Sequence, residues 1–128
     1  MHLLVVEDDE STLFYLQRIL NEMGYQVTTA EDGQQALQVL ESFKPDLVIS
    51  DLLMPNVTGP ELYSKVRNQI AREVPFVFIS GATGFDDFVD QQWLRDASAF
   101  LAKPFDMDQL KGTVRQLLSE REIPIPSE

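Results

Sequence analysis

Five short apolar segments alternate along the chain with segments whose apolar residues repeat at helical spacing. The apolar segments have the length of β-strands and lie at residues 3–6, 25–30, 46–51, 76–80 and 99–102. The helical spacing occurs between and after them, at residues 13–23, 36–40, 60–70, 85–94 and 107–118. Strict alternation of strands and helices predicts one parallel sheet with helices on both faces.

Residue types that begin or end helices support this segmentation. Asp9 or Ser11 can cap the first helix, Gly24 ends it, and Asp106 can cap the last one. We therefore interpret Asp9 as an acid favoured at a helix N-terminus rather than as a ligand. Residues 1–120 are expected to form one domain, and residues 121–128, which contain two prolines, a C-terminal tail or linker.

The composition excludes several kinds of protein. The 128 residues suit one domain, and the absence of cysteine rules out a disulfide framework, a thiolate zinc site and a cysteine nucleophile. With 21 acidic and 10 basic residues, the net charge of −11 argues against direct binding to nucleic acid or anionic membranes. No apolar run approaches the ~20 residues of a membrane span, and the N-terminus does not read as a signal peptide, so we expect a cytoplasmic protein.

Polar side chains that can bind a ligand lie at or just after the ends of four of the predicted strands. Glu7 and Asp8 follow the first strand, Asp51 and Ser80 end the third and fourth, and Lys103 follows the fifth. Ligands of parallel α/β sheets bind outside the carboxyl ends of the strands, which share one edge. These side chains are therefore expected to converge on one site.

The acidic members of this group point to a metal and a phosphoryl group. Two carboxylates ~4 Å apart repel by about 1 kcal/mol in bulk water and by about 4 kcal/mol at an effective dielectric of 20. Three of them need a nearby cation or must take up a proton. Mg²⁺, which prefers oxygen ligands and keeps several waters, is the expected cofactor. Ser80 and Lys103 can then hydrogen-bond and neutralise a phosphoryl group carried on a carboxylate.

Five motifs in this order resemble the receiver domain of two-component response regulators. They cover nearly the whole chain, from residue 3 to about residue 119, and are Val5-Val6-Glu7-Asp8, Asp51-Leu52-Leu53-Met54-Pro55, Gly59, Ser80-Gly81 and Phe100-Leu101-Ala102-Lys103-Pro104-Phe105. The resemblance implies an α/β, flavodoxin-like, doubly wound (βα)5 fold. Its five-stranded parallel sheet would have the order 2-1-3-4-5, with helices on both faces.

The same resemblance implies how the site works. Asp51 would be the phospho-acceptor, forming an aspartyl phosphate with the phosphoryl group of a phosphohistidine on a histidine kinase or phosphotransfer protein. Mg²⁺ would be bound by Asp8, Asp51 and the backbone carbonyl of Leu53, with Glu7 acting largely through water. The domain would catalyse only its own phosphorylation and dephosphorylation, and would not be an enzyme in the ordinary sense.

The remaining motif residues would convert the phosphorylation into a change at a partner-binding surface. Ser80 and Lys103 would contact the phosphoryl group, and Ser80 with Phe100 would form a switch that changes a partner-binding surface. The partners implied are a kinase or phosphotransfer protein and a downstream effector protein or domain. No direct contact of this domain with nucleic acid or membrane is expected, and a phosphorylation-dependent homodimer is allowed.

The chain departs from the family pattern at four positions. Glu7 stands where Asp is most common, Ser80 replaces the commoner Thr, and Phe100 replaces the commoner Tyr. Asp96 stands where Gly is usual before the fifth strand. Each of the first three keeps the essential group, namely a carboxylate, a hydroxyl or an aromatic ring, but Phe100 cannot make an outward hydroxyl hydrogen bond.

Three alternatives use the same architecture. A receiver-shaped adaptor that is never phosphorylated is disfavoured because every expected type of site residue is present. A Mg²⁺-dependent phosphohydrolase with an aspartyl nucleophile would need a second Asp two positions after Asp51, where this chain has Leu53. A flavodoxin-like cofactor binder would need a neutral loop after the first strand, where residues 7–10 are all acidic. His2, the only histidine, is interpreted as incidental, which argues against a histidine phosphocarrier.

Overall fold

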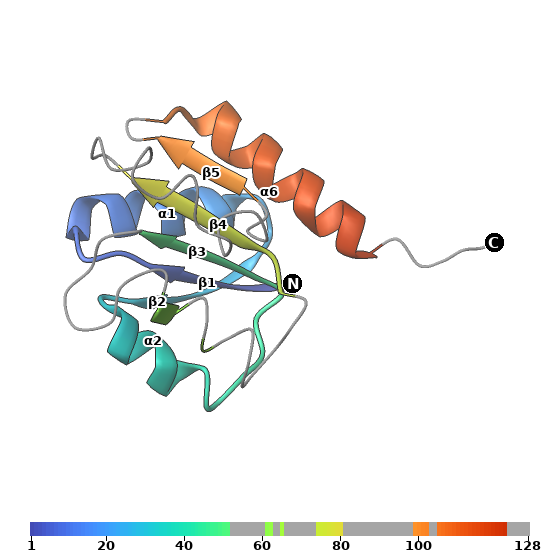
Figure 1. Ribbon diagram of the computed structural model, residues 1–128. Coiled ribbons are helices and arrows are strands. Elements are labelled where there is room, and N and C mark those ends of the chain that lie inside the picture. Colours follow the sequence, from blue (N-terminus) through green and yellow to red (C-terminus); the bar gives the residue numbers. More distant parts are fainter. Residues whose placement is uncertain (52–60, 63–64, 66–73, 81–98, 103–104, 123–128) are drawn as a thin grey trace.

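The described strands form one parallel sheet. The computed structural model describes residues 1–51, 61–62, 65, 74–80, 99–102 and 105–122 (Figure 1). The strands are β1 (His2–Val6), β2 (Gln26–Ala30), β3 (Leu47–Asp51), β4 (Phe76–Ser80) and β5 (Ala99–Ala102). Their order in the sheet is β2-β1-β3-β4-β5, and every neighbouring pair is parallel. The predicted strand order is therefore confirmed.

Helices cover both faces of this sheet. The helices α1 (Glu10–Glu22) and α6 (Met107–Glu122) lie on one face, and α2 (Gly33–Val39) lies on the other (Figure 1). Three residues of the helix predicted over 60–70 are described, and all three are helical. The helix predicted over 85–94 lies outside the described residues. Among the helices that are described, none combines the length and the apolar character needed to cross a bilayer.

The side chains of the central strands alternate between two buried layers. On β1, Leu3 and Val5 pack with α1 and α6, whereas Leu4 and Val6 pack in the layer that contains α2. All four are fully buried. Because helices cover both faces, a central strand has no solvent-facing side, and its sequence is a continuous apolar run. The strands at the centre thus hold the carboxyl edge rigidly.

The connection between α1 and β2 explains where β2 begins. Gly24, at φ +98°, follows the last turn of α1 in the left-handed region that favours glycine. Its N–H donates to the Asn21 carbonyl at 3.0 Å, and the Tyr25 N–H donates to the Leu20 carbonyl at 3.2 Å, which is the Schellman pattern. Tyr25 therefore belongs to the helix end, and β2 begins one residue later than predicted, at Gln26.

A cluster of three polar residues and one aromatic residue lies at the opposite, amino edge of the sheet. We call His2, Thr28, Phe43 and Asp46 the amino-edge cluster. The His2 N–H donates to the Asp46 carboxylate and the Asp46 N–H donates to the His2 carbonyl, each at 2.8 Å. His2 Nε2 lies 2.6 Å from Thr28 Oγ1, and the His2 ring stacks on Phe43 with centroids 4.0 Å apart. Asp46 thus tethers the chain before β3, which begins at Leu47 rather than at Asp46 as predicted.

Candidate functional site

The register of the sheet brings the end of β1 beside the end of β3. Val6 pairs with Ser50, so Glu7 follows β1 at the level where Asp51 ends β3. The Glu7 N–H donates to the Ala30 carbonyl at 3.0 Å, which keeps its backbone aligned with β2 as well. The strands alone therefore place the acidic residues that follow β1 next to Asp51.

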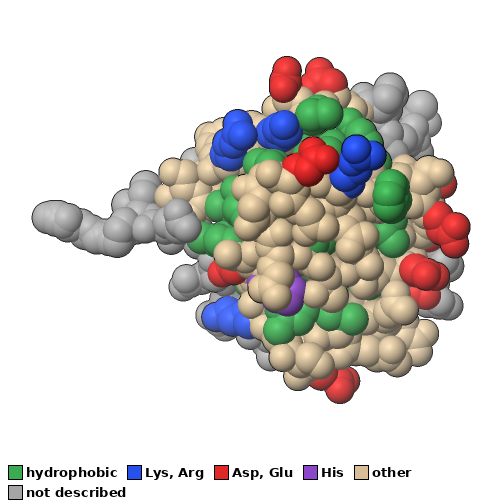
Figure 2. Space-filling model, turned by 180° about the vertical axis from the view of Figure 1, so that it is seen from behind, with side chains coloured by type: hydrophobic (Ala, Val, Ile, Leu, Met, Phe, Trp, Pro, Cys, Tyr) green, Lys and Arg blue, Asp and Glu red, His purple; other side chains and the backbone are tan. Residues whose placement is uncertain are grey.

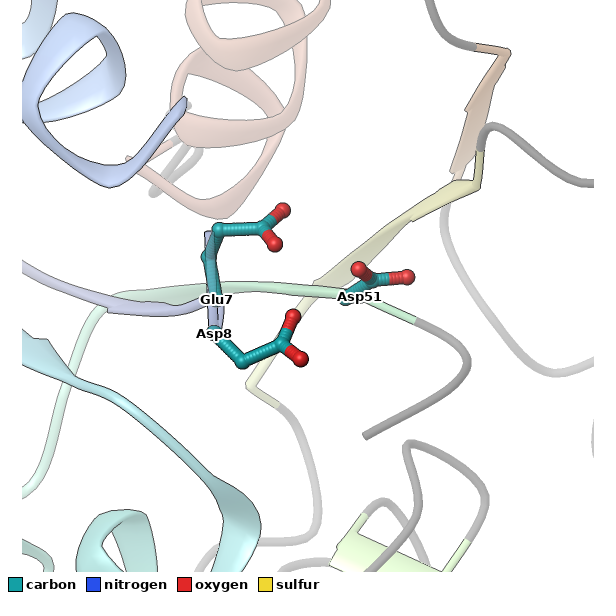
Figure 3. Close-up of side chains that lie close together, drawn as sticks. All are labelled: Glu7, Asp8 and Asp51. Atoms are coloured by element: carbon teal, nitrogen blue, oxygen red, sulfur yellow. The ribbon is translucent and has the colours of Figure 1, made fainter. Parts of the chain in front are cut away.

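Three carboxylates meet at this place. Glu7, Asp8 and Asp51, which we call the carboxylate cluster, each offer an oxygen, and these oxygens all lie within 4.8 Å of one another (Figure 3). Glu7 is fully buried, Asp51 is 8% exposed and Asp8 is exposed. The cluster is thus buried on the side of the sheet and open to solvent on the side of Asp8. The predicted convergence of these three residues is what the structure shows.

The start of α1 holds one member of the cluster in place. Glu7 Oε2 accepts a hydrogen bond from the Asp9 N–H at 3.0 Å. Asp9 is the N-cap of α1, and its Oδ2 accepts from the Thr12 N–H at 3.0 Å and from the Thr12 hydroxyl at 2.5 Å. The interpretation of Asp9 as a helix N-terminal acid is confirmed. The Glu7 carboxylate is therefore fixed by backbone at one of its two oxygens.

The cluster fits a small, hard dication. Mg²⁺ binds oxygen at about 2.0–2.1 Å in octahedral geometry, so two of its ligand oxygens lie at most about 4.2 Å apart. The oxygens of the cluster lie within 4.8 Å of one another, so two of the carboxylates can reach one such ion after small side-chain movements, and the third can act through a bound water. An ion bound there would also reduce the mutual repulsion of three carboxylates, which water screens poorly around the two buried ones.

The surface charge favours cations at the same edge. Figure 2, seen from behind, shows several acidic side chains along the side toward which the strands' carboxyl ends point, and the visible Lys and Arg side chains further from that side. The whole chain carries a net charge of −11. A field of this sign raises the local concentration of cations and repels anions that arrive without one.

The other predicted site residues are described in part or not at all. Ser80 ends β4, and its backbone pairs with Ala102 at the same edge as Asp51, while the backbone of Phe100 pairs with Phe78 inside β5. The side chains of Ser80 and Phe100 lie outside the described part of the structure, as do Leu53 and Lys103. Their roles stay predictions.

Comparison with known proteins identifies the family. The chain matches the response regulator receiver domain over residues 3–115. It belongs to the response regulator receiver family. The receiver role, in which the domain accepts a phosphoryl group, is thereby confirmed along with the fold, and the adaptor and phosphohydrolase alternatives are not favoured.

Individual relatives of this receiver domain differ in length. It is 33% identical over 125 residues to the alkaline phosphatase synthesis transcriptional regulatory protein PhoP of Bacillus subtilis, covering 98% of this chain and 51% of that protein. It is 31% identical over 116 residues to sporulation initiation phosphotransferase F of B. subtilis, and the match covers 91% of this chain and 92% of that protein. The chain thus spans about half of the first relative and nearly all of the second.

A solved structure provides a comparison with bound ions. The response regulator TrrA of Thermotoga maritima, crystallised in complex with Mg²⁺ and BeF, matches this receiver domain with a TM-score of 0.80 and 29% identity. The match covers 91% of this chain and 97% of TrrA.

Sequence reasoning did not predict the contact between Glu7 and Asp9. It assigned Asp9 correctly to the start of a helix, but the contact runs through the Asp9 backbone N–H, which every non-proline residue carries. The residue type at position 7 gave no signal, because a carboxylate of either length can accept from the N–H two residues further along the chain. Only the conformation of the turn decides whether that hydrogen bond forms.

Proposed function

We propose that Asp51 accepts the phosphoryl group and that the carboxylate cluster binds Mg²⁺ for this reaction. The observation that carries the proposal is the convergence of three carboxylate oxygens within 4.8 Å at the ligand-binding edge of a parallel sheet. Asp51 is the member that ends a central strand, and it is nearly buried. A nucleophile in that position is held rigidly and has little water to displace.

The transfer is a single displacement at phosphorus. An Oδ of Asp51 attacks the phosphorus of a phosphohistidine, the P–O bond forms as the P–N bond breaks, and the imidazole nitrogen leaves and takes up a proton. Asp8, Asp51 and the Leu53 carbonyl would hold Mg²⁺, with Glu7 acting largely through water, and the ion would supply positive charge for the phosphoryl oxygens. Water later hydrolyses the aspartyl phosphate, so the domain catalyses only its own phosphorylation and dephosphorylation.

The response to phosphorylation belongs to the residues at the ends of β4 and β5. Lys103 pairs with the phosphoryl oxygens, and the Ser80 hydroxyl moves to donate to them. Phe100 then fills the space that Ser80 leaves, and the surface beside β5 and α6 changes shape for its partners. Those partners are a histidine kinase or phosphotransfer protein upstream and an effector protein or domain downstream, and a phosphorylation-dependent homodimer is one form of output.

The domain boundary proposed here is residue 120. Residues 1–120 constitute the receiver domain, and residues 121–128 are a C-terminal tail or linker. The family match ends at residue 115 and α6 continues to Glu122, so the first two residues of the proposed tail are still helical.

Intact-protein mass spectrometry tests the proposal. The purified chain is incubated with acetyl phosphate and Mg²⁺, and we expect the mass of one phosphoryl group to appear, and to be absent when a chelator replaces Mg²⁺. Asp51→Asn should abolish the addition. Unchanged modification of that variant would refute Asp51 as the acceptor.

A matched control comes from another acid at the same edge. Asp32 follows β2 and caps α2 by accepting from the Gln35 N–H at 2.8 Å, and it lies outside the carboxylate cluster. Asp32→Asn removes one charge but keeps a side chain that caps a helix equally well. This variant should be phosphorylated like the parent protein.

A further inference from the structure

A continuous chain of hydrogen bonds joins the carboxylate cluster to the first turn of α1. Asp9 is its central residue and uses its polar groups in two directions. Its N–H points back to Glu7 Oε2 at 3.0 Å. Its carboxylate accepts from Thr12, and its carbonyl accepts from the Leu13 N–H at 2.9 Å. The orientation of the Asp9 N–H is therefore set by the helix start.

Glu7 depends on this hydrogen bond more than a shorter acid would. A glutamate side chain has three rotatable bonds, and a carboxylate that must be ordered for cation binding loses that freedom. Because Glu7 is fully buried and one oxygen is held by the Asp9 N–H, its carboxylate is oriented before any ion arrives. A group ordered in advance binds with a smaller entropic cost.

We propose that Asp9 is a positioning residue for the dication site, acting through Glu7. Its side chain fixes the first turn of α1, the fixed turn aims the Asp9 N–H, and that N–H orients the Glu7 carboxylate toward the bound ion. By thermodynamic linkage, a dication bound at the carboxylate cluster stabilises the first turn of α1 by the same coupling free energy. This inference rests on the proposed Mg²⁺ site and adds to it a residue that does not touch the ion.

Calorimetric titration with Mg²⁺ tests the first half of the proposal. Asp9→Ala removes the capping carboxylate and should raise the Mg²⁺ dissociation constant about tenfold, the lower end of what losing an outer-shell partner costs. Asp9→Asn loses the same charge but keeps a cap, and should stay within about threefold of the parent protein. The difference between Ala and Asn isolates positioning from charge.

A second cap provides the matched control. Asp32 caps α2 through the Gln35 N–H at 2.8 Å, the same type of contact that Asp9 makes with Thr12. Asp32→Ala removes one N-cap and one negative charge, as Asp9→Ala does, but the cap that it removes belongs to α2 rather than to α1. Its Mg²⁺ dissociation constant should be unchanged.

Amide hydrogen exchange tests whether a bound dication stabilises the first turn of α1. In the parent protein, saturating Mg²⁺ should slow exchange of the Asp9 and Thr12 amides, and this protection should be absent in Asp9→Ala. If Asp9→Ala does not fold, Thr12→Val keeps a β-branched side chain and removes only the hydroxyl donor to Asp9. It should weaken Mg²⁺ binding in the same direction by a smaller factor.

The outcomes separate this inference from the proposed function. If the parent protein binds Mg²⁺ and Asp9→Ala binds it equally well without change in amide protection, Asp9 has no positioning role and the Mg²⁺ site stands. Equal weakening by Asp9→Ala and Asp32→Ala would also overturn the inference, because charge alone would then explain both. If the parent protein does not bind Mg²⁺, the proposed metal site fails and the inference fails with it.

Discussion

The two edges of the sheet differ in how their polar groups are paired. In the amino-edge cluster, donors meet acceptors: the His2 N–H meets the Asp46 carboxylate, and His2 Nε2 meets the Thr28 hydroxyl. In the carboxylate cluster, three acceptors of the same charge meet one another. The first arrangement stabilises the fold by itself, whereas the second becomes favourable when a cation joins it. The contrast separates structural polar residues from functional ones within a single sheet.

The two edges also differ in what they connect. In the amino-edge cluster, His2 of β1 contacts Thr28 of β2 and Asp46 just before β3. The cluster therefore connects three segments of the chain. The carboxylate cluster joins the ends of β1 and β3, which backbone pairing already aligns. Removing an amino-edge side chain should therefore cost stability, while removing a charge at the carboxyl edge should cost function.

The largest expected effect comes from Asp51→Asn. Phosphorylation by acetyl phosphate should be lost completely, and yet the free energy of unfolding in Mg²⁺-free buffer should rise by about 1 kcal/mol, because one of three mutually repelling charges is gone. Urea denaturation followed by circular dichroism measures this change. A destabilised Asp51→Asn would show that the two edges do not differ in the way described.

The next largest effect is expected from Asp46→Ala at the opposite edge. The His2 N–H would lose a charged acceptor at 2.8 Å, and the free energy of unfolding should fall by about 2 kcal/mol. Asp46→Asn keeps an acceptor oxygen and should cost less. Mg²⁺ affinity and phosphorylation should stay at the level of the parent protein in both variants, and a loss of Mg²⁺ affinity here would break the separation between the edges.

Much of the fold could be predicted from the sequence, and the two exceptions have different causes. The apolar run from Leu3 to Val6 identifies a strand buried on both faces, because no other element of that length has that pattern. The limits of β2 and β3 were each placed one residue early. Tyr25 belongs to the end of α1, and Asp46 is held by His2, 44 residues away. The first contact is local and depends on how the helix ends, whereas the second spans the sheet and leaves no trace in a local pattern. The role of His2 could not be predicted for the same reason.

The candidate site was predictable for a different reason. Glu7, Asp8 and Asp51 were identified from position alone, since parallel strands bring their carboxyl ends to one edge whatever lies between them. The link from Asp9 to Glu7 was not, because it depends on the backbone conformation of a single turn. Topology can therefore be read from sequence at this edge, but the orientation of a side chain within it cannot.

Mg²⁺ should stabilise the protein through the carboxyl edge only. At a free Mg²⁺ concentration ten times the dissociation constant, linkage predicts a gain of about 1.4 kcal/mol in the free energy of unfolding. Asp8→Asn should reduce this gain, and Asp46→Ala should show the full gain on top of its lower starting stability. A gain of equal size in Asp8→Asn would show that the ion binds elsewhere, and the carboxylate cluster would then not be the metal site.

The smallest effect is expected from Thr28→Val in the amino-edge cluster. Thr28→Val keeps the shape and the β-branched character of the side chain but removes the hydroxyl that lies 2.6 Å from His2 Nε2. Because the site is only partly buried, water can replace part of the lost hydrogen bond, and the free energy of unfolding should fall by about 0.5–1 kcal/mol. Urea denaturation at a fixed pH measures it. The stacking of the His2 ring on Phe43 should survive, so Thr28→Val combined with Asp46→Ala should cost more than either change alone. If the double variant is no less stable than Asp46→Ala, the hydroxyl contributes nothing, and the amino edge is held by the Asp46 contact and the ring stack alone.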